Sequence, residues 1–421
     1  MRRAGAIVAL TCAAAIGVSA CGGGGGGGTK SGGTISPDAA KSAKGTVTWC
    51  IGKDTTGSFK QVVALHNKAN PNVKARLIEL PEDATQQLNQ LTQRERAKSS
   101  QCDVLGMDVV WTAQFASQGW LKDLSKVVDQ RRNEFIPSTL ETAHYQDKYW
   151  AIPFNTNAGF LYYRTDQVSS PPSDWAQVYN EAKAKNGIVY QGSQYEGLTV
   201  DYLELLYAAG GKVLSDDGKS AAINSPQATQ ALTLMVNGIK DGAAPKAVLT
   251  YKEEESRRAF ESGKYTFMRN WPYAYALDKK ASIGNKFAVA PLPGLNGKPG
   301  SGVIGGYNLG INAYSKNPDA ALEFANYITG AKPQAIFAAK AALPPVLTQT
   351  YSDPSVTSAL PFASKLLQAV QQAKARPVSP VYQQISESIY KNVYSALQGS
   401  TSPKAAVGKM QTEINAALKT F

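Results

Sequence analysis

The chain has 421 residues, with 44 Lys and Arg against 32 Asp and Glu, so its formal net charge is +12. Since a chain of this length exceeds what one hydrophobic core usually organises, we expect two lobes of about 150 to 200 residues each. Hydrophobic residues make up 43% of the chain and charged residues 18%, which excludes a disordered chain and a coiled coil, and two His with four scattered Cys argue against a zinc module.

The first twenty residues have the pattern of a secretory signal peptide. Arg2 and Arg3 form a positive start, and the apolar run that follows covers residues 4–18. This run is shorter than the roughly 20 residues that a transmembrane helix requires. We therefore expect residues 1–20 to be removed on export.

A lipid attachment site follows the apolar run. Residues 18–21 read Val-Ser-Ala-Cys, which fits the bacterial lipobox and predicts that cleavage leaves Cys21 as a lipid-modified N-terminus. An ordinary signal peptide with an accidental Cys is the alternative. The glycine run at 22–28 argues against it, because a flexible coil of this kind serves an anchored protein as a tether. We expect residues 21–44 to form the anchor and linker.

The basic excess is spread along the chain and forms no Arg- or Lys-rich block. A nucleic-acid-binding protein concentrates such charge in a stripe with interleaved aromatic residues. The pattern therefore predicts no nucleic-acid partner, and instead a basic surface that faces an anionic cell envelope.

The folded part begins near Gly45 with alternating strands and helices. Apolar patterns predict three strands and two intervening helices, at Thr46–Ile51, Phe59–Ala69, Val73–Leu80, Ala84–Lys98 and Asp103–Val110. This order predicts a parallel sheet that binds its ligand at the carboxyl ends of the strands. The loops at those ends, 52–55, 81–83 and 108–111, carry carboxylates and an aromatic residue.

Cys50 and Cys102 are the two thiols of the folded part, and export permits a disulfide between them. If the first and third strands are parallel neighbours with residues 47–50 level with 104–107, the two Cys lie toward opposite ends. At about 3.3 Å per residue their offset approaches about 15 Å, whereas a disulfide needs Cα atoms within about 7 Å. We therefore expect that they are not bridged.

The rest of the chain predicts a second α/β region and a helical C-terminal region. Short strands at 150–154 and 159–164 are joined through 155–157, and a later strand covers 302–312. Helices are predicted at 173–184, 199–209, 227–240, 253–261, 318–328, 333–341, 358–373, 381–397 and 403–418. This arrangement predicts two α/β lobes whose chain crosses between them more than once.

Several stretches resemble a known family. They read CDVLGMDVVW at 102–111, AIPFNTNAGFLYYRTD at 151–166, QYEGL at 194–198, FMRNWPY at 267–273, GGYNLGI at 305–311, SKNP at 315–318 and RP at 376–377. In order and spacing they are similar to the substrate-binding lipoproteins of carbohydrate ATP-binding-cassette (ABC) importers, of the trehalose- and maltose-binding type.

The resemblance implies a two-lobed α/β fold of the periplasmic-binding-protein (Venus-flytrap) class, with crossover hinge strands and a helical C-terminal region. A sugar would lie in the cleft between the lobes. We expect 45–154 and 305–358 to form one lobe, and 155–304 and 359–421 to form the other.

The resemblance also implies which residues bind the sugar. Asp108, at the end of the third strand, would bind sugar hydroxyls, and a helix cap is its alternative role. Asn155 and Asn157 stand at the entry to the second lobe, with a plain turn as the alternative. Position 157 is often Asp in the family. An amide at this position can donate as well as accept, which would change the arrangement of sugar hydroxyls that the site recognises.

Trp271 and Tyr273 match the aromatic pair that packs on sugar faces. An aromatic pair is commonly part of a core, but Pro272 between the two favours a loop that presents both rings.

Gly305 and Gly306 would let backbone amides approach a hydroxyl, with Tyr307 covering the ring, and a β-bulge is the alternative. Arg376, in the link between two C-terminal helices, matches a family arginine that reaches the sugar. Weaker assignments are Asp54, Thr55, Asp83, Gln87 and Glu196. Gln87 stands where closer relatives often carry Arg.

The predicted function is capture without chemistry. A lipid-anchored monomer on the extracytoplasmic face of the cell membrane would bind a disaccharide of the trehalose or maltose type, close by hinge motion and deliver it to an ABC permease, without metal or cofactor. An anchored glycoside hydrolase with Asp108 and Glu196 as its carboxylates stays open as an alternative. So does a protein that binds a glycerophosphodiester, which the basic excess would suit.

Overall fold

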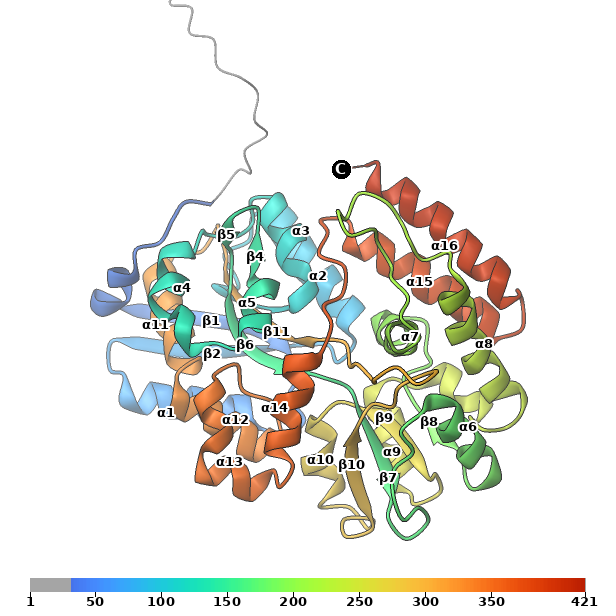
Figure 1. Ribbon diagram of the computed structural model, residues 1–421. Helices are drawn as coiled ribbons and strands as arrows, with labels where there is room; N and C mark the ends of the chain where they lie inside the picture. Colours follow the sequence, from blue (N-terminus) through green and yellow to red (C-terminus); the bar gives the residue numbers. More distant parts are fainter. Residues whose placement is uncertain (1–31, 421) are drawn as a thin grey trace, which may run out of the picture.

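The computed structural model describes residues 32–420. The predicted signal peptide at 1–20, the lipidation site Cys21 and the first part of the linker lie outside the described residues. Within them the chain forms two lobes that lie side by side, each built on its own sheet (Figure 1). In this part of the chain, no helix is both long enough and apolar enough to span a bilayer.

Lobe 1 is built on a five-stranded sheet in the order β2-β1-β3-β11-β6. Its strands are β1 (Gly45–Gly52), β2 (Val73–Leu80), β3 (Val104–Asp108), β6 (Ile152–Asn157) and β11 (Gly305–Ile311). β1 is parallel to β2 and β3, as predicted, whereas β11 runs antiparallel between β3 and β6. The carboxyl ends of β1, β2 and β3 therefore meet at one edge of the sheet.

Helices cover both faces of this sheet. In Figure 1, α1 (Ser58–Ala69) and α12 (Ala331–Ala341) lie below it, and α2 (Ala84–Arg96) and α3 (Thr112–Ser117) lie above. The other elements in these parts of the chain are η1 (Pro37–Ser42), η2 (Val109–Trp111), α4 (Ser125–Arg131), η3 (Arg132–Glu134), α5 (Pro137–Ala143), β4 (His144–Tyr145), β5 (Lys148–Tyr149), α11 (Pro318–Ile328), η5 (Thr348–Ser352) and α13 (Pro354–Ala359).

Lobe 2 is built on a four-stranded sheet in the order β10-β7-β9-β8. Its strands are β7 (Phe160–Arg164), β8 (Ile188–Val189), β9 (Phe267–Asn270) and β10 (Phe287–Pro291). Around it lie α6 (Trp175–Ala184), α7 (Glu196–Ala208), α8 (Pro226–Lys240), η4 (Lys246–Thr250), α9 (Glu253–Glu261), α10 (Tyr273–Asp278), α14 (Ala363–Gln372), α15 (Tyr382–Leu397) and α16 (Pro403–Leu418).

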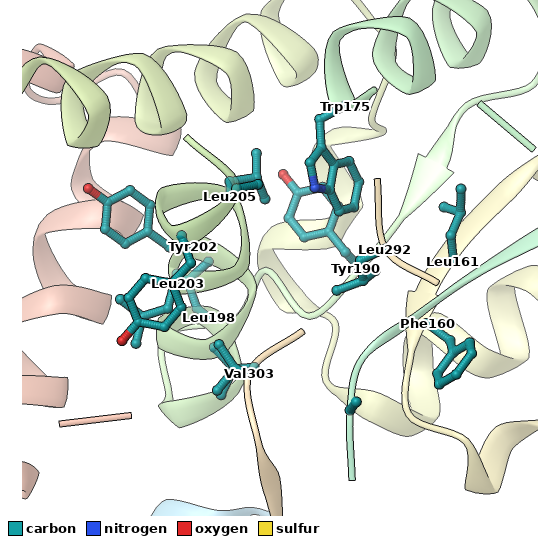
Figure 2. Packing of buried hydrophobic residues seen from close by; sticks show 14 of the residues in the cluster. Phe160, Leu161, Trp175, Tyr190, Leu198, Tyr202, Leu203, Leu205, Leu292 and Val303 are labelled. Atoms are coloured by element: carbon teal, nitrogen blue, oxygen red, sulfur yellow. The ribbon is translucent and has the colours of Figure 1, made fainter. Parts of the chain in front are cut away.

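Helix α7 runs through the middle of the lobe 2 core, and every one of its residues is buried. Figure 2 shows its apolar residues, among them Leu198, Leu203 and Leu205, in one layer with Trp175 and Tyr190. α7 is buried on every side although it carries polar residues, and it packs against α8 and α15. It also carries the buried carboxylates of Glu196, Asp201 and Glu204, which require partners.

The helix predicted over 358–373 is two helices in the structure. α13 ends at Ala359 and α14 begins at Ala363. Pro361 explains the break, because a proline disfavours helical backbone in the residue before it, and Leu360 has φ −122° and ψ 83°.

The chain passes from lobe 1 to lobe 2 between β6 and β7, and returns between β10 and β11. The link from α14 to α15 runs beside this second crossing. Ile304 N donates to Lys374 O at 2.8 Å, and Lys374 N donates to Gly302 O at 3.0 Å. This pairing brings the 373–381 link, with Arg376, to the junction of the lobes. The residue boundaries assigned to the lobes from the sequence stay a prediction.

Residues 32–44, which the sequence assigns to the linker, pack on lobe 1. Gly32 N donates to Leu121 O and Ile35 N to Asp123 O, both at 3.2 Å. Ile35 and Ala43 are buried, and η1 lies against α11. The described chain therefore enters lobe 1 well before β1.

The prediction that Cys50 and Cys102 are not bridged is wrong. They form a disulfide, with their Cα atoms 5.7 Å apart. The prediction set Cys50 level with Met107, two residues away from the observed register, and it assumed an extended chain from the strand Asp103–Val110 back to Cys102. β3 begins only at Val104, and the chain bends at 101–103. Cys50 lies opposite Leu105 in the register, and the bend returns Cys102 to it.

A protein beginning at residue 32 contains no other Cys, so thiol titration of the denatured, unreduced chain is expected to count no free thiols. Because the bridge closes a loop with a sequence separation of 52, replacing both Cys by Ala is expected to lower the free energy of unfolding by roughly 4 kcal/mol, as measured by urea denaturation. Two titratable thiols in the unreduced protein would contradict the pairing.

Candidate functional site

A cavity of about 710 Å³ lies between the lobes, at the carboxyl edge of the lobe 1 sheet. All fourteen residues that the sequence singled out for ligand contact line it: Asp54, Thr55, Asp83, Gln87, Asp108, Asn155, Asn157, Glu196, Trp271, Tyr273, Gly305, Gly306, Tyr307 and Arg376. A cavity of this size, enclosed by two lobes, is suited to a small molecule. The structure thus brings the fourteen residues together, and their roles in binding belong to the proposal below.

The carboxylates of the cavity stand at the starts of helices. Asp54 accepts from Phe59 N at 2.8 Å at the start of α1, Asp83 accepts from Gln86 N at 2.8 Å as the N-cap of α2, and Asp108 accepts from Val110 N at 3.2 Å as the N-cap of η2. Glu196 is the first residue of α7. Because free N–H groups and the helix dipole favour negative charge at an N-terminus, the cavity is acidic although the chain is basic.

Arg376 joins the two lobes inside this cavity. Its Nη2 donates to Asp108 Oδ1 of lobe 1 at 2.5 Å, and its Nη1 donates to Glu196 Oε1 of lobe 2 at 2.6 Å. Its side chain is only 2% exposed. Although burial alone would lower the pKa of Arg376, the Asp108 and Glu196 carboxylates raise it above the ordinary value.

Glu196 has further partners from α15. Tyr382 Oη donates to Glu196 Oε1 at 2.6 Å, and Ser386 Oγ donates to Oε2. Burial nevertheless raises the pKa of Glu196 above its usual value, against the opposing effect of the Arg376 guanidinium. The Arg376 guanidinium therefore opposes the effect of burial on this carboxylate.

Three buried polar atoms on residues that line the cavity have no hydrogen-bond partner within residues 32–420: Asn155 Nδ2, Asn157 Oδ1 and Arg376 Nε. The side chain of Asn155 is held in place by its amide oxygen, because Tyr307 N donates to Asn155 Oδ1 at 3.1 Å. Unpaired buried polar atoms are costly. Each of the three atoms is itself buried, so it does not face the open volume of the cavity.

Trp271 and Tyr273 form an aromatic wall in lobe 2. The Trp271 ring lies over the Arg269 guanidinium at 4.2 Å, and Arg269 is itself paired with Glu204 and Asp201 of α7. A loop was predicted to carry both rings, but Tyr273 is the first residue of α10. Pro272 stands at the N-cap with φ −55° and ψ −29°, a backbone that starts a helix and does not break it.

The two glycines of β11 have packing roles. A Cβ on Gly305 would lie 3.0 Å from the Trp271 ring, so the glycine makes room for that ring. Gly306 has φ +113°, and a Cβ there would lie 2.2 Å from Asn155 O of the neighbouring strand. The register shift between β11 and β6 falls after Tyr307, so the bulge that the sequence left open lies one residue beyond the glycine pair.

Tyr307 and Gln87 bond to each other. Tyr307 Oη donates to Gln87 Oε1 at 2.9 Å, and Gln87 Nε2 donates to Pro81 O at 2.9 Å. Both side chains lie over Gly52, where a Cβ would come within 3 Å of each. Gln87 therefore orients Tyr307 in the cavity wall.

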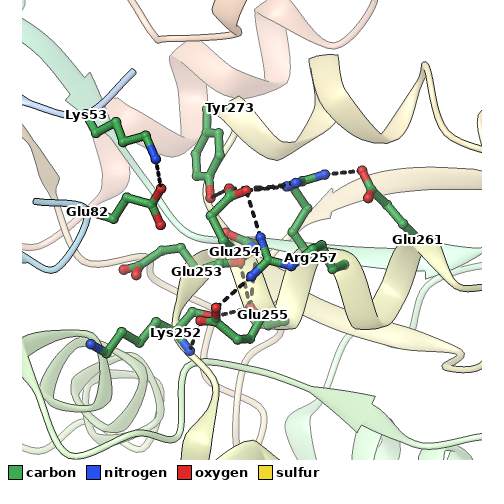
Figure 3. A network of polar contacts seen from close by, with 12 residues as sticks. Lys53, Glu82, Lys252, Glu253, Glu254, Glu255, Arg257, Glu261 and Tyr273 are labelled. Atoms are coloured by element: carbon green, nitrogen blue, oxygen red, sulfur yellow. Dashed lines mark hydrogen bonds and ion pairs between the residues drawn. The ribbon is translucent and has the colours of Figure 1, made fainter. Parts of the chain in front are cut away.

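Six charged residues that the sequence reading missed also line the cavity: Lys53, Glu82, Lys252, Glu253, Glu254 and Glu255. Figure 3 shows Lys53 paired with Glu82 and the acidic start of α9 beside them. Lys252 Nζ reaches across the lobes to Asp83 Oδ2 at 2.7 Å. Lys53 and Glu82 fall in loops that the sequence placed at the strand ends. The acidic start of α9 reads as an ordinary helix N-terminus, and nothing local shows that it faces the cleft.

Within residues 32–420, no group of three or more His, Cys, Asp or Glu side chains is arranged to hold a metal ion. His66, for instance, is buried and bonds Glu323 Oε2 at 2.8 Å.

Comparison with known proteins decides the family. A profile of the bacterial extracellular solute-binding proteins matches residues 52–335. The chain belongs to this family. A probable ABC transporter-binding protein of Deinococcus radiodurans is 35% identical over 404 residues, which cover 89% of this chain and 95% of the relative. A maltotriose-binding protein of Pyrococcus abyssi is 28% identical over 64% of this chain and 60% of its own length.

Solved structures of the family show the same fold. The maltose-bound MalE3 of T. maritima superposes with a TM-score of 0.84 at 32% identity, and the match covers 88% of this chain and 98% of that one. The GacH receptor of Streptomyces glaucescens superposes with a TM-score of 0.81 at 24% identity, over 90% and 99% of the two chains. The predicted two-lobed solute-binding fold is confirmed.

Replacing Arg376 by Gln is expected to lower the free energy of unfolding by about 3 kcal/mol or more in urea denaturation, because it leaves Asp108 and Glu196 as buried charges without a cation. The matched control is Lys252→Gln, which removes the other lobe-to-lobe pair at a side chain that is 35% exposed and is expected to cost less than about 1 kcal/mol. Equal losses in the two variants would contradict the role given to Arg376.

Proposed function

We propose that this protein is the lipid-anchored solute-binding component of an ABC importer, that it captures a disaccharide of the maltose or trehalose type between its lobes, and that it delivers the sugar as a monomer to a membrane permease. The observation that carries the proposal is that one cavity between the lobes is lined by carboxylate, amide and guanidinium side chains together with the Trp271–Tyr273 wall. A sugar presents both features that such a cavity recognises, namely hydroxyls that donate and accept and apolar C–H faces that pack on rings.

The relatives support the class of ligand. The structure of T. maritima MalE3 contains maltose, and the P. abyssi relative is a maltotriose-binding protein. The lipobox ending at Cys21 and the glycine run behind it support the anchor. The segment from residue 32 packs on lobe 1, so the tether would leave the protein from that lobe.

The cavity favours binding over hydrolysis. The two carboxylates that a hydrolase would use, Asp108 and Glu196, both bind the same guanidinium and act as acceptors for other groups. A general acid must instead carry a proton that points at the leaving oxygen. The charge of the cavity also argues against a phosphodiester, since acidic side chains outnumber basic ones on its wall.

Calorimetry with maltose, trehalose and maltotriose tests the proposal, and binding of at least one of them at micromolar affinity, about −8 kcal/mol, is expected. Replacing Trp271 by Ala is expected to weaken that affinity about tenfold or more, because the ring face is lost, while Trp271→Phe keeps a smaller ring and loses less. Absence of heat with any carbohydrate would contradict the proposal. Release of nitrophenol from a nitrophenyl glucoside would favour the hydrolase. Heat with glycerophosphodiesters alone would favour a protein that binds glycerophosphodiesters.

A further inference from the structure

The aromatic wall of the cavity depends on a helix that is too short to be stable alone. Trp271 and Pro272 lead into α10, which covers only Tyr273–Asp278 and has no side-chain cap. Isolated helices below about 12 residues are marginal in water. The position of the wall must therefore come from what α10 packs against, and α9 is one of the elements in contact with it.

At the cavity end, α10 is tied to α9 through Tyr273. Its Oη donates to Glu254 Oε1 at 2.7 Å. Glu254 is buried, and the hydrogen bonds from Arg257 and Tyr273 lower its pKa despite its burial. Glu254 is therefore a charged acceptor that fixes the Tyr273 ring through its hydroxyl.

At the far end, α10 meets α9 again through a pair of carboxyl groups. Asp278 has no exposed surface, and its carboxyl faces that of Glu261. Neither Asp278 oxygen finds a donor among residues 32–420. Because burial and the neighbouring Glu261 raise the pKa of Asp278, Asp278 holds a proton at neutral pH that it can donate to Glu261.

Arg257 connects the two ends. Its Nη2 donates to Glu254 Oε2 at 2.7 Å, and its Nη1 donates to a carboxylate oxygen of Glu261. Figure 3 shows Arg257 between these two acids, with the Tyr273 hydroxyl on the far side of Glu254. Glu254, Arg257 and Glu261 are spaced by three and four residues, so they follow one face of α9.

We propose that Arg257 is the positioning residue of the aromatic wall: by holding Glu254 and Glu261 in one row, it lets α9 grip α10 at Tyr273 and at Asp278. Arg257 acts on the ligand through Tyr273, which lines the cavity, whereas Arg257 itself does not. Its effect on affinity rests on the proposed function, but its effect on α10 does not.

The proton on Asp278 makes the contact between α9 and α10 depend on pH. Burial and the neighbouring Glu261 raise the pKa of Asp278 to about 9, against the opposing effect of Arg257. The charged or titratable groups that act on it are Glu261, Arg257 and Glu254 of α9, with Tyr162 of β7 nearby. Because this pKa lies above its unfolded value, the stability that the proton contributes is complete at acid pH and is lost as the pH rises toward 9.

Hydrogen exchange of residues 271–278 in the protein without ligand tests the grip directly. Arg257→Gln is expected to lower the protection of this segment about tenfold or more, because a charged bidentate contact is lost. Arg258→Gln is the matched control. Arg258 is the next residue and is 54% exposed, it pairs with Glu255 at 2.6 Å and approaches Glu254 only at 3.6 Å, so its loss is expected to lower the protection far less. Equal protection in wild type and Arg257→Gln, or equal losses in both variants, would overturn the proposal.

Titration with maltotriose in parallel separates this proposal from the proposed function. Arg257→Gln is expected to weaken binding about tenfold where Arg258→Gln does not. If no sugar binds but the protection falls as expected, the proposed function fails and the positioning role stands. If a sugar binds equally well to wild type and Arg257→Gln, the positioning role fails and the function stands.

A second variant keeps the inference testable if Arg257→Gln does not fold. Asp278→Asn supplies a permanent N–H donor to Glu261, so its melting temperature is expected to equal that of the wild type at pH 4 and to exceed it by several degrees at pH 8. Glu95, buried in lobe 1 with a pKa raised to about 8 by burial, is present in both proteins and cancels in the difference. A difference that does not change with pH would contradict the shared proton.

Discussion

The contact of Arg376 with Asp108 and Glu196 is the interaction on which the rest of the cavity depends. One guanidinium binds a carboxylate from each lobe, and it does so where it is almost completely buried. Buried ion pairs of this kind contribute little net stability compared with an apolar contact, but removing one partner is costly because it leaves charge without compensation. The contact therefore acts mainly on geometry, since it holds a carboxylate of each lobe on one guanidinium.

The acidity of the cavity follows from the fold. Parallel strands end at one edge, the helices that follow them begin there, and helix N-termini favour Asp and Glu. Lobe 2 adds the starts of α7 and α9, so carboxylates gather from both sides in a chain whose net charge is +12. Most of them are neutralised within the protein, as Asp83 is by Lys252 and Glu254 by Arg257. The same cavity wall also carries neutral amides and the rings of Trp271 and Tyr273.

Most of the fold could be predicted because its signals are local. The strands at 46–51 and 73–80 and the helices at 59–69 and 318–328 were found within a few residues, since their apolar periodicity is written in the segment itself. Errors arose where a local pattern was extended too far. The register of the third strand was placed two residues off, a helix was continued across Pro361, and a loop was expected at Pro272, which stands at the start of α10.

The order of most elements and the fourteen residues that line one cavity could be inferred from the sequence, because each is carried by a short stretch or by a family motif. Which of these residues bond to one another depends on the tertiary structure. Arg376 and Glu196 are 180 residues apart, and Tyr307 and Gln87 are 220 residues apart. The acidic residues at the start of α9 could not be predicted as part of the site for the same reason. The neighbours of a side chain across the cavity depend on how the chain crosses between the lobes, and a local sequence pattern does not predict that crossing.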